Sequence, residues 1–311
     1  MPGDPARLPD QTGRTVVVTG ATAGIGYFAA EQLAAAGADV VLASRSANKL
    51  RRAADVLRGA VPESSVRSVV LGLGSMVLVD AAAAELPSLP RLDAVLVSGG
   101  VMSMDRRALT EDGLPLILRT HVAANARLVA RLLPALVATA VEHRSLSRVV
   151  HTSTGFVQLM RLSADDLQRV PRLGSTAHTK AKTATEIFAF ELDRRLRAHG
   201  LPVASVVARP GVGVDAKTPE RPGIRDATTP YQRNPYTPWA QGRDTAALSA
   251  VRAVTDPDVR GGEYSPSGPL RGAAISVPSP PRTAAPAGDA TERLWRQVEE
   301  LASLPIIVGP A

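Results

Sequence analysis

The sequence predicts an α/β fold in which a doubly wound, mainly parallel sheet of about seven strands is flanked by helices. Three observations predict this architecture. Short β-branched apolar runs alternate along the chain with longer periodic segments typical of helices. The first of these runs, residues 15–19, passes through a glycine turn directly into a helical segment. No long polar linker divides the 311 residues, which favours a single domain.

The glycine turn after the first strand is the first candidate binding site. Its glycines are Gly20, Gly24 and Gly26, with Thr22 and Ile25 between them. Glycine lets the backbone approach a phosphate closely, and the N-terminus of a helix offers free N–H groups and a positive dipole end. The turn therefore predicts binding of a dinucleotide pyrophosphate. The alternative is an ordinary strand-to-helix turn that binds nothing.

Six further strands and their helices are expected along the chain. The strands are expected at 38–43, 66–71, 93–97, 147–154, 203–208 and 262–264. The helices are expected at 27–36, 50–57, 77–86, from 110–113 through to 134, around 187–196, at 244–255 and at 293–304. We expect residues 1–13 to form a flexible leader, 14–275 the domain, and 276–311 a Pro/Ala-rich linker with a last helix that a capping box at 289–292 begins.

The end of the second strand bears on the choice of cofactor. An acidic residue at this point binds the adenosine ribose of NAD, whereas an arginine pairs with the 2′-phosphate of NADP. The chain has Arg45 there and no acid, so NADP is favoured. The alternative is an exposed arginine at the start of a helix.

Composition excludes several other classes of protein. The formal charge of +7 is spread along the chain and aromatic residues make up 3%, which is not typical of nucleic-acid binding. The chain has no cysteine, hence no thiolate nucleophile, and no acidic residue stands at ligand spacing from a histidine, so we expect no metal site. No apolar run reaches the roughly 20 residues of a membrane span and no signal peptide is apparent, so a cytoplasmic protein is expected.

The glycine spacing, Gly-x-x-x-Gly-x-Gly after a threonine, resembles the short-chain dehydrogenase/reductase family. The resemblance runs from about Gly13 to the last helix. It implies a single-domain Rossmann fold that binds NAD or NADP, a small-molecule substrate, and a homodimer or homotetramer. The C-terminal tail would obstruct the usual packing surface of such an oligomer.

The resemblance also implies the residues around the cofactor. Gly99 and Gly100 match the end of the family's Asn-Asn-Ala-Gly, whose two amides are absent here, and Pro210-Gly211 is similar to the turn beside the nicotinamide. The Pro-rich segment at about 213–242 matches the family's substrate lid. Its aromatic residues either stack on a flat substrate or anchor the lid to the core; they are Tyr231, Tyr236 and Trp239.

The catalytic positions of the family are only partly kept. Lys182 matches the lysine of the family's Tyr-x-x-x-Lys, which also holds the ribose, but His178 stands at the tyrosine. Thr154 matches the serine that binds the substrate carbonyl, and Ser153, one place before it, is expected to be catalytic as well. His121 stands where the family's helix has an asparagine that holds a water of the proton relay.

Two kinds of enzyme, and a third alternative, follow from these residues. The first is a ketoreductase-like NADP(H) enzyme of secondary metabolism that acts on a small cyclic or aromatic carbonyl, with His178 and Thr154 replacing the usual pair. The second is a non-redox isomerase, cyclase or dehydratase in which one neutral and one protonated imidazole, from His178 and His121, act as acid and base. In this second enzyme NADP is a structural element or is not bound at all. The lysine is expected to lower the pKa of His178 in either case. The third is a catalytically silent relative.

Overall fold

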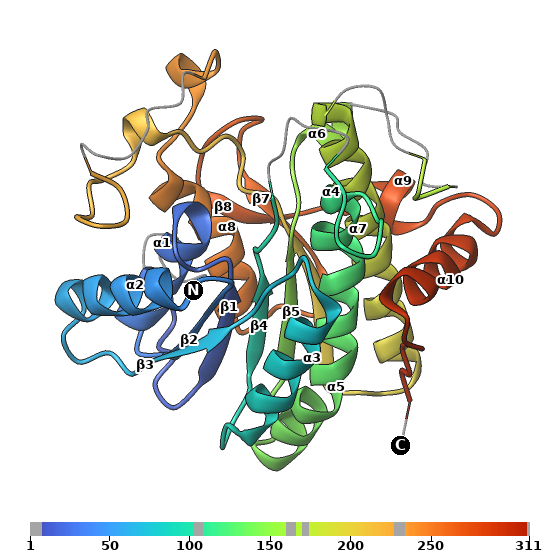
Figure 1. The fold of residues 1–311 in the computed structure, drawn as a ribbon, viewed down its shortest axis with the longest axis horizontal. Coiled ribbons are helices and arrows are strands. Elements are labelled where there is room, and N and C mark those ends of the chain that lie inside the picture. Colours follow the sequence, from blue (N-terminus) through green and yellow to red (C-terminus); the bar gives the residue numbers. More distant parts are fainter. Residues whose placement is uncertain (1–7, 102–107, 160–165, 170–173, 227–233, 310–311) are drawn as a thin grey trace.

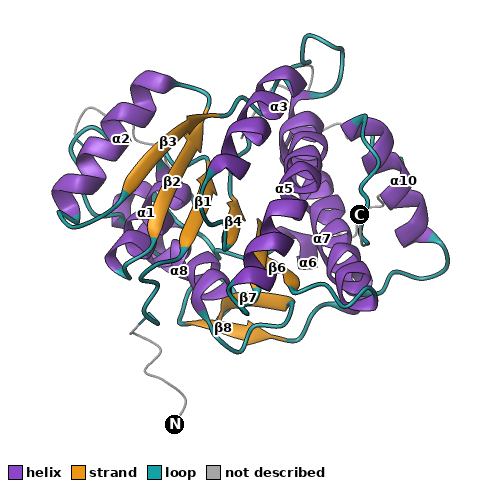
Figure 2. Cartoon of the chain, turned by 90° about the horizontal axis from the view of Figure 1, so that it is seen from below, coloured by secondary structure: helices purple, strands orange, loops and turns teal. Residues whose placement is uncertain are grey.

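The computed structural model describes residues 8–101, 108–159, 166–169, 174–226 and 234–309. Its centre is one eight-stranded sheet in the order β3-β2-β1-β4-β5-β6-β7-β8 (Figures 1 and 2). Neighbouring strands are parallel throughout except β7 and β8, which are antiparallel. The strands are β1 (Thr15–Thr19), β2 (Asp39–Ser44), β3 (Val66–Val70), β4 (Ala94–Val97), β5 (Ser147–Thr152), β6 (Val203–Ala208), β7 (Gly262–Pro266) and β8 (Ala274–Val277). The predicted doubly wound α/β fold is confirmed.

Helices cover both faces of this sheet because its strands are apolar on both sides. Alternate residues of one strand enter different cores: Val17 lies in the core under α3, α5, α7 and α10, while Val16 and Val18 lie in the core under α1, α2 and α8. The helices are α1 (Gly24–Ala35), α2 (Ala47–Ala60), α3 (Met76–Glu85), α4 (Leu116–Leu118), α5 (Ala124–Glu142), α6 (Phe156–Leu159), α7 (Gly174–Ala198), α8 (Arg243–Thr255), α9 (Pro281–Ala284) and α10 (Ala290–Ala302). Short 3₁₀ turns are η1 (Leu86–Ser88), η3 (Asp215–Lys217) and η4 (Thr237–Trp239).

The long helical region begins later than the sequence predicted. Residues 110–113 form a turn, closed by a bridge between Leu109 and Pro115, and the helix starts at Leu116. It then passes through a π-helical turn, η2 (Arg119–Ala123), before α5. A π turn inserts one extra residue into the helix and so rotates the side chains that follow it. Such turns are frequent at functional sites.

The C-terminal segment packs on the domain more closely than a linker would. The last two residues of the eighth strand, β8 at the sheet edge, belong to the segment expected to be a linker, and α10 packs on α5 and α7. Trp295 stacks on Phe188 with ring centroids 5.2 Å apart, and the Arg195 guanidinium lies 4.0 Å above the indole. The predicted capping box is wrong, because the Asp289 side chain makes no cap hydrogen bond and instead pairs with Arg293.

Candidate active site

The carboxyl edge of the parallel strands gathers most of the predicted site residues. The glycine turn follows β1, Gly99 and Gly100 follow β4, Thr154 follows β5, and Pro210 follows β6. In doubly wound sheets ligands bind at this edge. Helix α7 carries His178, whose ring lies against that of His121, and Lys182, whose ammonium reaches the Thr152 carbonyl at the end of β5.

The glycine turn is too tightly packed to accept side chains. Gly20 and Gly24 have φ of 69° and 58°, where other residues are strained. A Cβ on Gly20 would lie 2.8 Å from the Cα of Gly99, and one on Gly26 would lie 2.5 Å from the Gly20 carbonyl oxygen. Helix α1 begins here behind Ala23, which offers no side-chain cap. The N–H groups of the first turn are therefore open to an anion, and these residues fit a pyrophosphate.

Two further residues of the turn have structural contacts. The Thr22 hydroxyl lies 3.2 Å from that of Ser44 at the end of β2, which ties the turn to the neighbouring strand. Ile25 is half-buried against the apolar core of α1 and α2. Arg45 follows Ser44, is exposed, and has no hydrogen bond or ion pair with any residue that the structure describes. Its guanidinium is available to a phosphate.

Gly100 makes room for His121. The backbone of the loop after β4 is held by Thr19, whose hydroxyl accepts N–H bonds from Ser98 (3.0 Å) and Gly99 (2.8 Å). A Cβ on Gly100 would overlap the imidazole ring of His121. The glycine is therefore required by the histidine across from it.

The two histidines that the sequence placed at catalytic positions lie together. The rings of His121 and His178 meet edge to face, with centroids 5.0 Å apart. His121 is buried on the π turn, with Nε2 2.9 Å from the carbonyl oxygen of Val101. Its Nδ1 has no hydrogen-bond partner among the described residues. A nitrogen left this way accepts a hydrogen bond readily from water or a ligand.

The charge of this pair differs from the prediction. Burial, followed by the positive charge of Lys182, lowers the pKa of His178 to about 4 and that of His121 well below 6.5. Burial lowers the pKa of Lys182 to about 8, although Glu186 raises it. Both imidazoles are therefore neutral at neutral pH, and the expected neutral-and-protonated couple is wrong. Of these three groups, Lys182 is the one that carries a positive charge at neutral pH.

Lys182 and Thr154 both lie at the carboxyl end of β5. The buried ammonium of Lys182 donates to the Thr152 carbonyl at 2.5 Å. Thr154 is half-buried, and its hydroxyl accepts a 3.4 Å hydrogen bond from the N–H of Phe156. The hydroxyl still has a hydrogen to donate to a substrate oxygen.

Ser153, in contrast, does not belong to the site. It is 3% exposed and its hydroxyl donates to Glu186 at 2.5 Å. Arg209 donates to both oxygens of the same carboxylate (2.9 and 2.7 Å) and also to Glu263 at 2.7 Å. Our assignment of Ser153 as catalytic is thus corrected, because its side chain is used inside the fold.

This buried network was not predicted, and it supports the Pro210-Gly211 turn that follows Arg209. The Pro210 carbonyl accepts a 2.9 Å bond from Gln241, and a Cβ on Gly211 would overlap the Leu270 carbonyl. A charged residue directly before a Pro-Gly turn, at the end of an otherwise apolar strand, is the sequence signal that could have revealed it.

The third histidine near the strand ends, His151, is a core residue. It is 2% exposed and meets Phe188 edge to face with centroids 5.9 Å apart. Burial, and then Lys182, lowers its pKa to about 3. His151 is therefore a neutral ring packed between β5 and α7 in the core.

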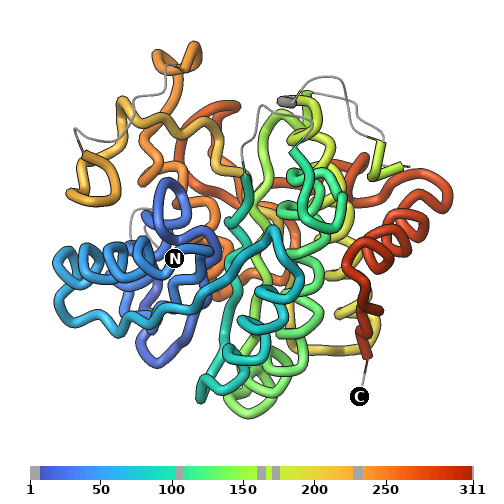
Figure 3. Tube along the Cα trace, in the orientation of Figure 1, coloured from blue at the N-terminus to red at the C-terminus, as the bar shows by residue number. Residues whose placement is uncertain are grey.

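The described parts of the predicted lid, residues 213–242, contact α1 and α6. Arg221 pairs with Glu31 of α1 through two 2.8 Å bonds, and the gold and orange tube lies beside the blue α1 in Figure 3. Tyr236 contacts Phe156 of α6 with ring centroids 6.2 Å apart. Trp239 is 60% exposed, so it does not anchor the lid by burial, and Tyr231 lies outside the described residues.

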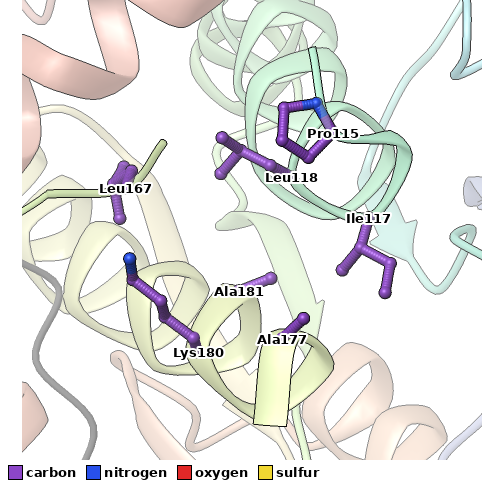
Figure 4. Close-up of a pocket in the computed structure, with 7 residues that line it drawn as sticks. All are labelled: Pro115, Ile117, Leu118, Leu167, Ala177, Lys180 and Ala181. Atoms are coloured by element: carbon purple, nitrogen blue, oxygen red, sulfur yellow. The ribbon is translucent and has the colours of Figure 1, made fainter. Parts of the chain in front are cut away.

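A small apolar hollow lies on the neighbouring face of α7 (Figure 4). It is lined by Pro115, Ile117 and Leu118 on one side and by Leu167, Ala177, Lys180 and Ala181 on the other. Neither histidine of the pair lines it. Within the described ranges there is no cluster of three His, Asp or Glu that could hold a metal ion.

One helical run in the described part of the chain, Leu116–Glu142, is long and apolar enough for a membrane span. Its most apolar window is 61% buried in the fold, which is typical of a core helix.

Comparisons with known proteins agree with this architecture. A family model described as short chain dehydrogenase matches residues 14–220. Polyprenol dehydrogenase of Mus musculus is 34% identical over 209 residues, which cover 67% of this chain and 62% of that protein. The match thus spans less than two thirds of this relative.

Solved structures resemble the chain over a greater length. A crystal structure of an uncharacterized protein from Mycobacterium paratuberculosis has a TM-score of 0.76 at 26% identity, covering 98% of this chain and 99% of that one. A metagenomic short-chain oxidoreductase in complex with NADP has a TM-score of 0.58 at 20% identity, over 83% and 99% of the two chains.

Proposed function

This chain belongs to the short chain dehydrogenase family, and from that premise we propose that it is an NADP(H)-dependent oxidoreductase of a small cyclic or aromatic carbonyl metabolite. One observation carries the proposal. The open glycine turn lies at the same sheet edge as the His121–His178 pair and Lys182. A hydride cofactor and a proton-transfer group would therefore meet at one place.

The choice of NADP rests on Arg45. Its exposed guanidinium lies next to Ser44, which contacts the glycine turn through Thr22. An arginine in this position pairs with the 2′-phosphate that distinguishes NADP from NAD. When bound, the nicotinamide supplies the hydride.

In this proposal Thr154, which follows β5, binds the substrate carbonyl oxygen, and two residues of α7 supply the proton that this oxygen receives. Thr154 donates a hydrogen bond to the substrate carbonyl oxygen. The neutral imidazole of His178 gives its N–H proton to that oxygen and takes a proton at its other nitrogen. Lys182, with a pKa of about 8, is the source of that proton at neutral pH. His121 holds a water at its unpartnered Nδ1, in the role of the family's asparagine.

The lid suggests the substrate class. Tyr236 and Trp239 on the lid and Phe156 on α6 are 40%, 60% and 38% exposed, which leaves aromatic surface for a flat or apolar molecule. A polyprenol, the substrate named for the mouse relative, belongs in the same screen.

A second candidate is a non-redox acid/base enzyme, an isomerase, cyclase or dehydratase. The neutral state of both imidazoles favours it, because a neutral imidazole has a free nitrogen to accept a proton and is a weak acid at neutral pH. In such an enzyme His178 removes a proton from a carbon atom of the substrate, and Lys182 or His121 returns a proton to another substrate atom. No hydride is transferred. A silent relative remains the outcome if neither reaction occurs.

We also propose that the protein is cytoplasmic and forms the homodimer or homotetramer that the family implies. Helix α10 packs on α5 and α7 of its own chain, so any such contact must use surface that α10 leaves open. Light scattering on the purified chain measures the oligomeric state.

The test is a substrate screen that follows two signals at once, NADPH absorbance and conversion of the organic substrate. Conversion with loss of NADPH supports the oxidoreductase, and conversion with NADPH unchanged supports the non-redox enzyme. His178→Ala should abolish either reaction, while the exposed His143→Ala serves as a matched control. His178→Tyr restores the residue of the family motif, and a gain of ketone reduction in it would show that the remaining site is built for hydride transfer.

A further inference from the structure

Arg243, at the start of α8, lies directly over the glycine turn. A Cβ built on Gly24 would be 3.0 Å from its Nη1 and 3.7 Å from its Cδ. The first turn of α1 itself has no charged side chain, since it reads Gly-Ile-Gly-Tyr. A cation from a segment more than two hundred residues away therefore reaches the point where α1 exposes its N–H groups.

The orientation of this guanidinium is fixed by Asp215 of η3. Nε and Nη2 of Arg243 each lie 3.0 Å from one carboxylate oxygen of Asp215, which is a bidentate pair. The two side chains are 31% and 12% exposed. Nη1 is on the other side of the guanidinium from this pair, and it has no hydrogen-bond partner in the described part of the chain. Its two N–H groups are available at the turn.

The same arginine joins the two ends of the lid. Its backbone N–H donates to the Thr218 hydroxyl at 2.9 Å, and that hydroxyl donates to the Val214 carbonyl at 2.8 Å. Lys217 donates to the Ala240 carbonyl at 2.8 Å. A ligand that binds Arg243 is therefore linked through this arginine to the base of the predicted lid.

We propose that Arg243 binds the pyrophosphate of the dinucleotide through Nη1, and that Asp215 positions it. The inference rests on the proposed function and adds Arg243 to the cofactor-binding residues, among which the sequence analysis did not include it. A guanidinium has enough N–H groups to hold the Asp215 carboxylate on one side and a phosphate oxygen on the other, which a lysine ammonium on a flexible stem does not do in a fixed direction. Cofactor binding then holds the lid base in place.

The experiment compares Arg243→Gln with Arg45→Gln by titrating each variant with NADPH and with NADH. The pyrophosphate is common to both cofactors, so Arg243→Gln should weaken both by the same factor, about tenfold or more, and leave their ratio unchanged. Arg45→Gln should weaken NADPH alone. The two arginines are therefore distinguished by the affinity ratio and not only by loss of binding.

A double-mutant cycle tests the positioning role of Asp215. Asp215→Asn should weaken both cofactors in the wild-type background and have no further effect in Arg243→Gln, because it acts through that arginine. Arg243→Lys keeps the charge without the fork and should weaken both cofactors less than Arg243→Gln does. If Arg243→Gln does not fold, as judged by thermal unfolding without cofactor, Arg243→Lys replaces it in the comparison.

Affinities within twofold of wild type in the folded Arg243→Gln variant would overturn the inference, as would a loss confined to NADPH. Either result leaves the proposed function intact, because the wild-type chain still binds. If wild type binds neither nucleotide, the proposed function fails and this inference fails with it.

Discussion

Replacing the buried His151 by leucine is expected to make the fold more resistant to acid. His151 is 2% exposed against Phe188, and its Nε2 has no hydrogen-bond partner among the described residues. Burial, together with Lys182 on the helix packed against it, lowers its pKa in the folded protein to about 3. The unfolded chain restores the ordinary value of about 6.5.

The magnitude follows from the two pKa values. Because the folded pKa is the lower one, the unfolded state binds more protons between about pH 6.5 and 3, so stability falls as the pH falls through this range. Between about pH 7 and pH 5 the unfolded imidazole gains most of a proton and the folded one almost none. His151 alone should therefore lower the free energy of unfolding by about 2 kcal/mol over that interval.

Urea denaturation of wild type, His151→Leu and the exposed control His143→Gln at both pH values measures this quantity. We expect the loss between neutral and acid pH to be about 2 kcal/mol smaller in His151→Leu than in the other two proteins. An equal acid dependence in all three would refute the assignment of His151 as a neutral core residue whose protonation opposes folding.

Three other substitutions and one profile test the remaining parts of the account. His178→Ala should lower turnover by about 100-fold or more while the melting temperature stays near that of wild type, and near-normal turnover would contradict its role. Gly100→Ala should lower the free energy of unfolding by about 1–3 kcal/mol in urea, because its methyl group must displace the ring of His121. Trp295→Ala should cost about 3–5 kcal/mol in the same assay, since the indole is 2% exposed between Phe188 and Arg195; a small loss would mean that α10 is not part of the core. For the proton role of Lys182, a pH–rate profile of turnover should fall as the pH rises past about 8, where this lysine loses its proton, and a flat profile would exclude it as the acid.

The sheet and most of its helices could be predicted because the local signals agree with the tertiary environment. The run Thr15–Thr19 is β-branched, fully buried and followed by glycines, so one interpretation satisfies propensity, burial and turn geometry together. The edge strand Ala274–Val277 was missed because it is half exposed and short, and its stability comes from pairing with β7 rather than from its own apolar pattern. The late start of the long helix depends on the bridge between Leu109 and Pro115, a contact that periodicity does not contain.

The candidate site was predicted as a set of positions, and its chemical state was not. The family resemblance put His121 and His178 at catalytic positions, and their rings do meet. Their charge depends on burial and on the field of Lys182, which are properties of the folded state. Ser153 was misassigned for a similar reason: its partner Glu186 is 33 residues away, and only the fold brings them together. Arg243 was overlooked because nothing near it in the sequence indicates that it reaches Gly24.

Calorimetric titration of the purified wild-type chain with NADPH and with NADH tests the central claim most directly. The account predicts saturable binding of both nucleotides, with NADPH the tighter because Arg45 is free to pair with its 2′-phosphate. Absence of binding by either nucleotide to a chain shown to be folded would contradict it, and the glycine turn would then be an ordinary connection between β1 and α1.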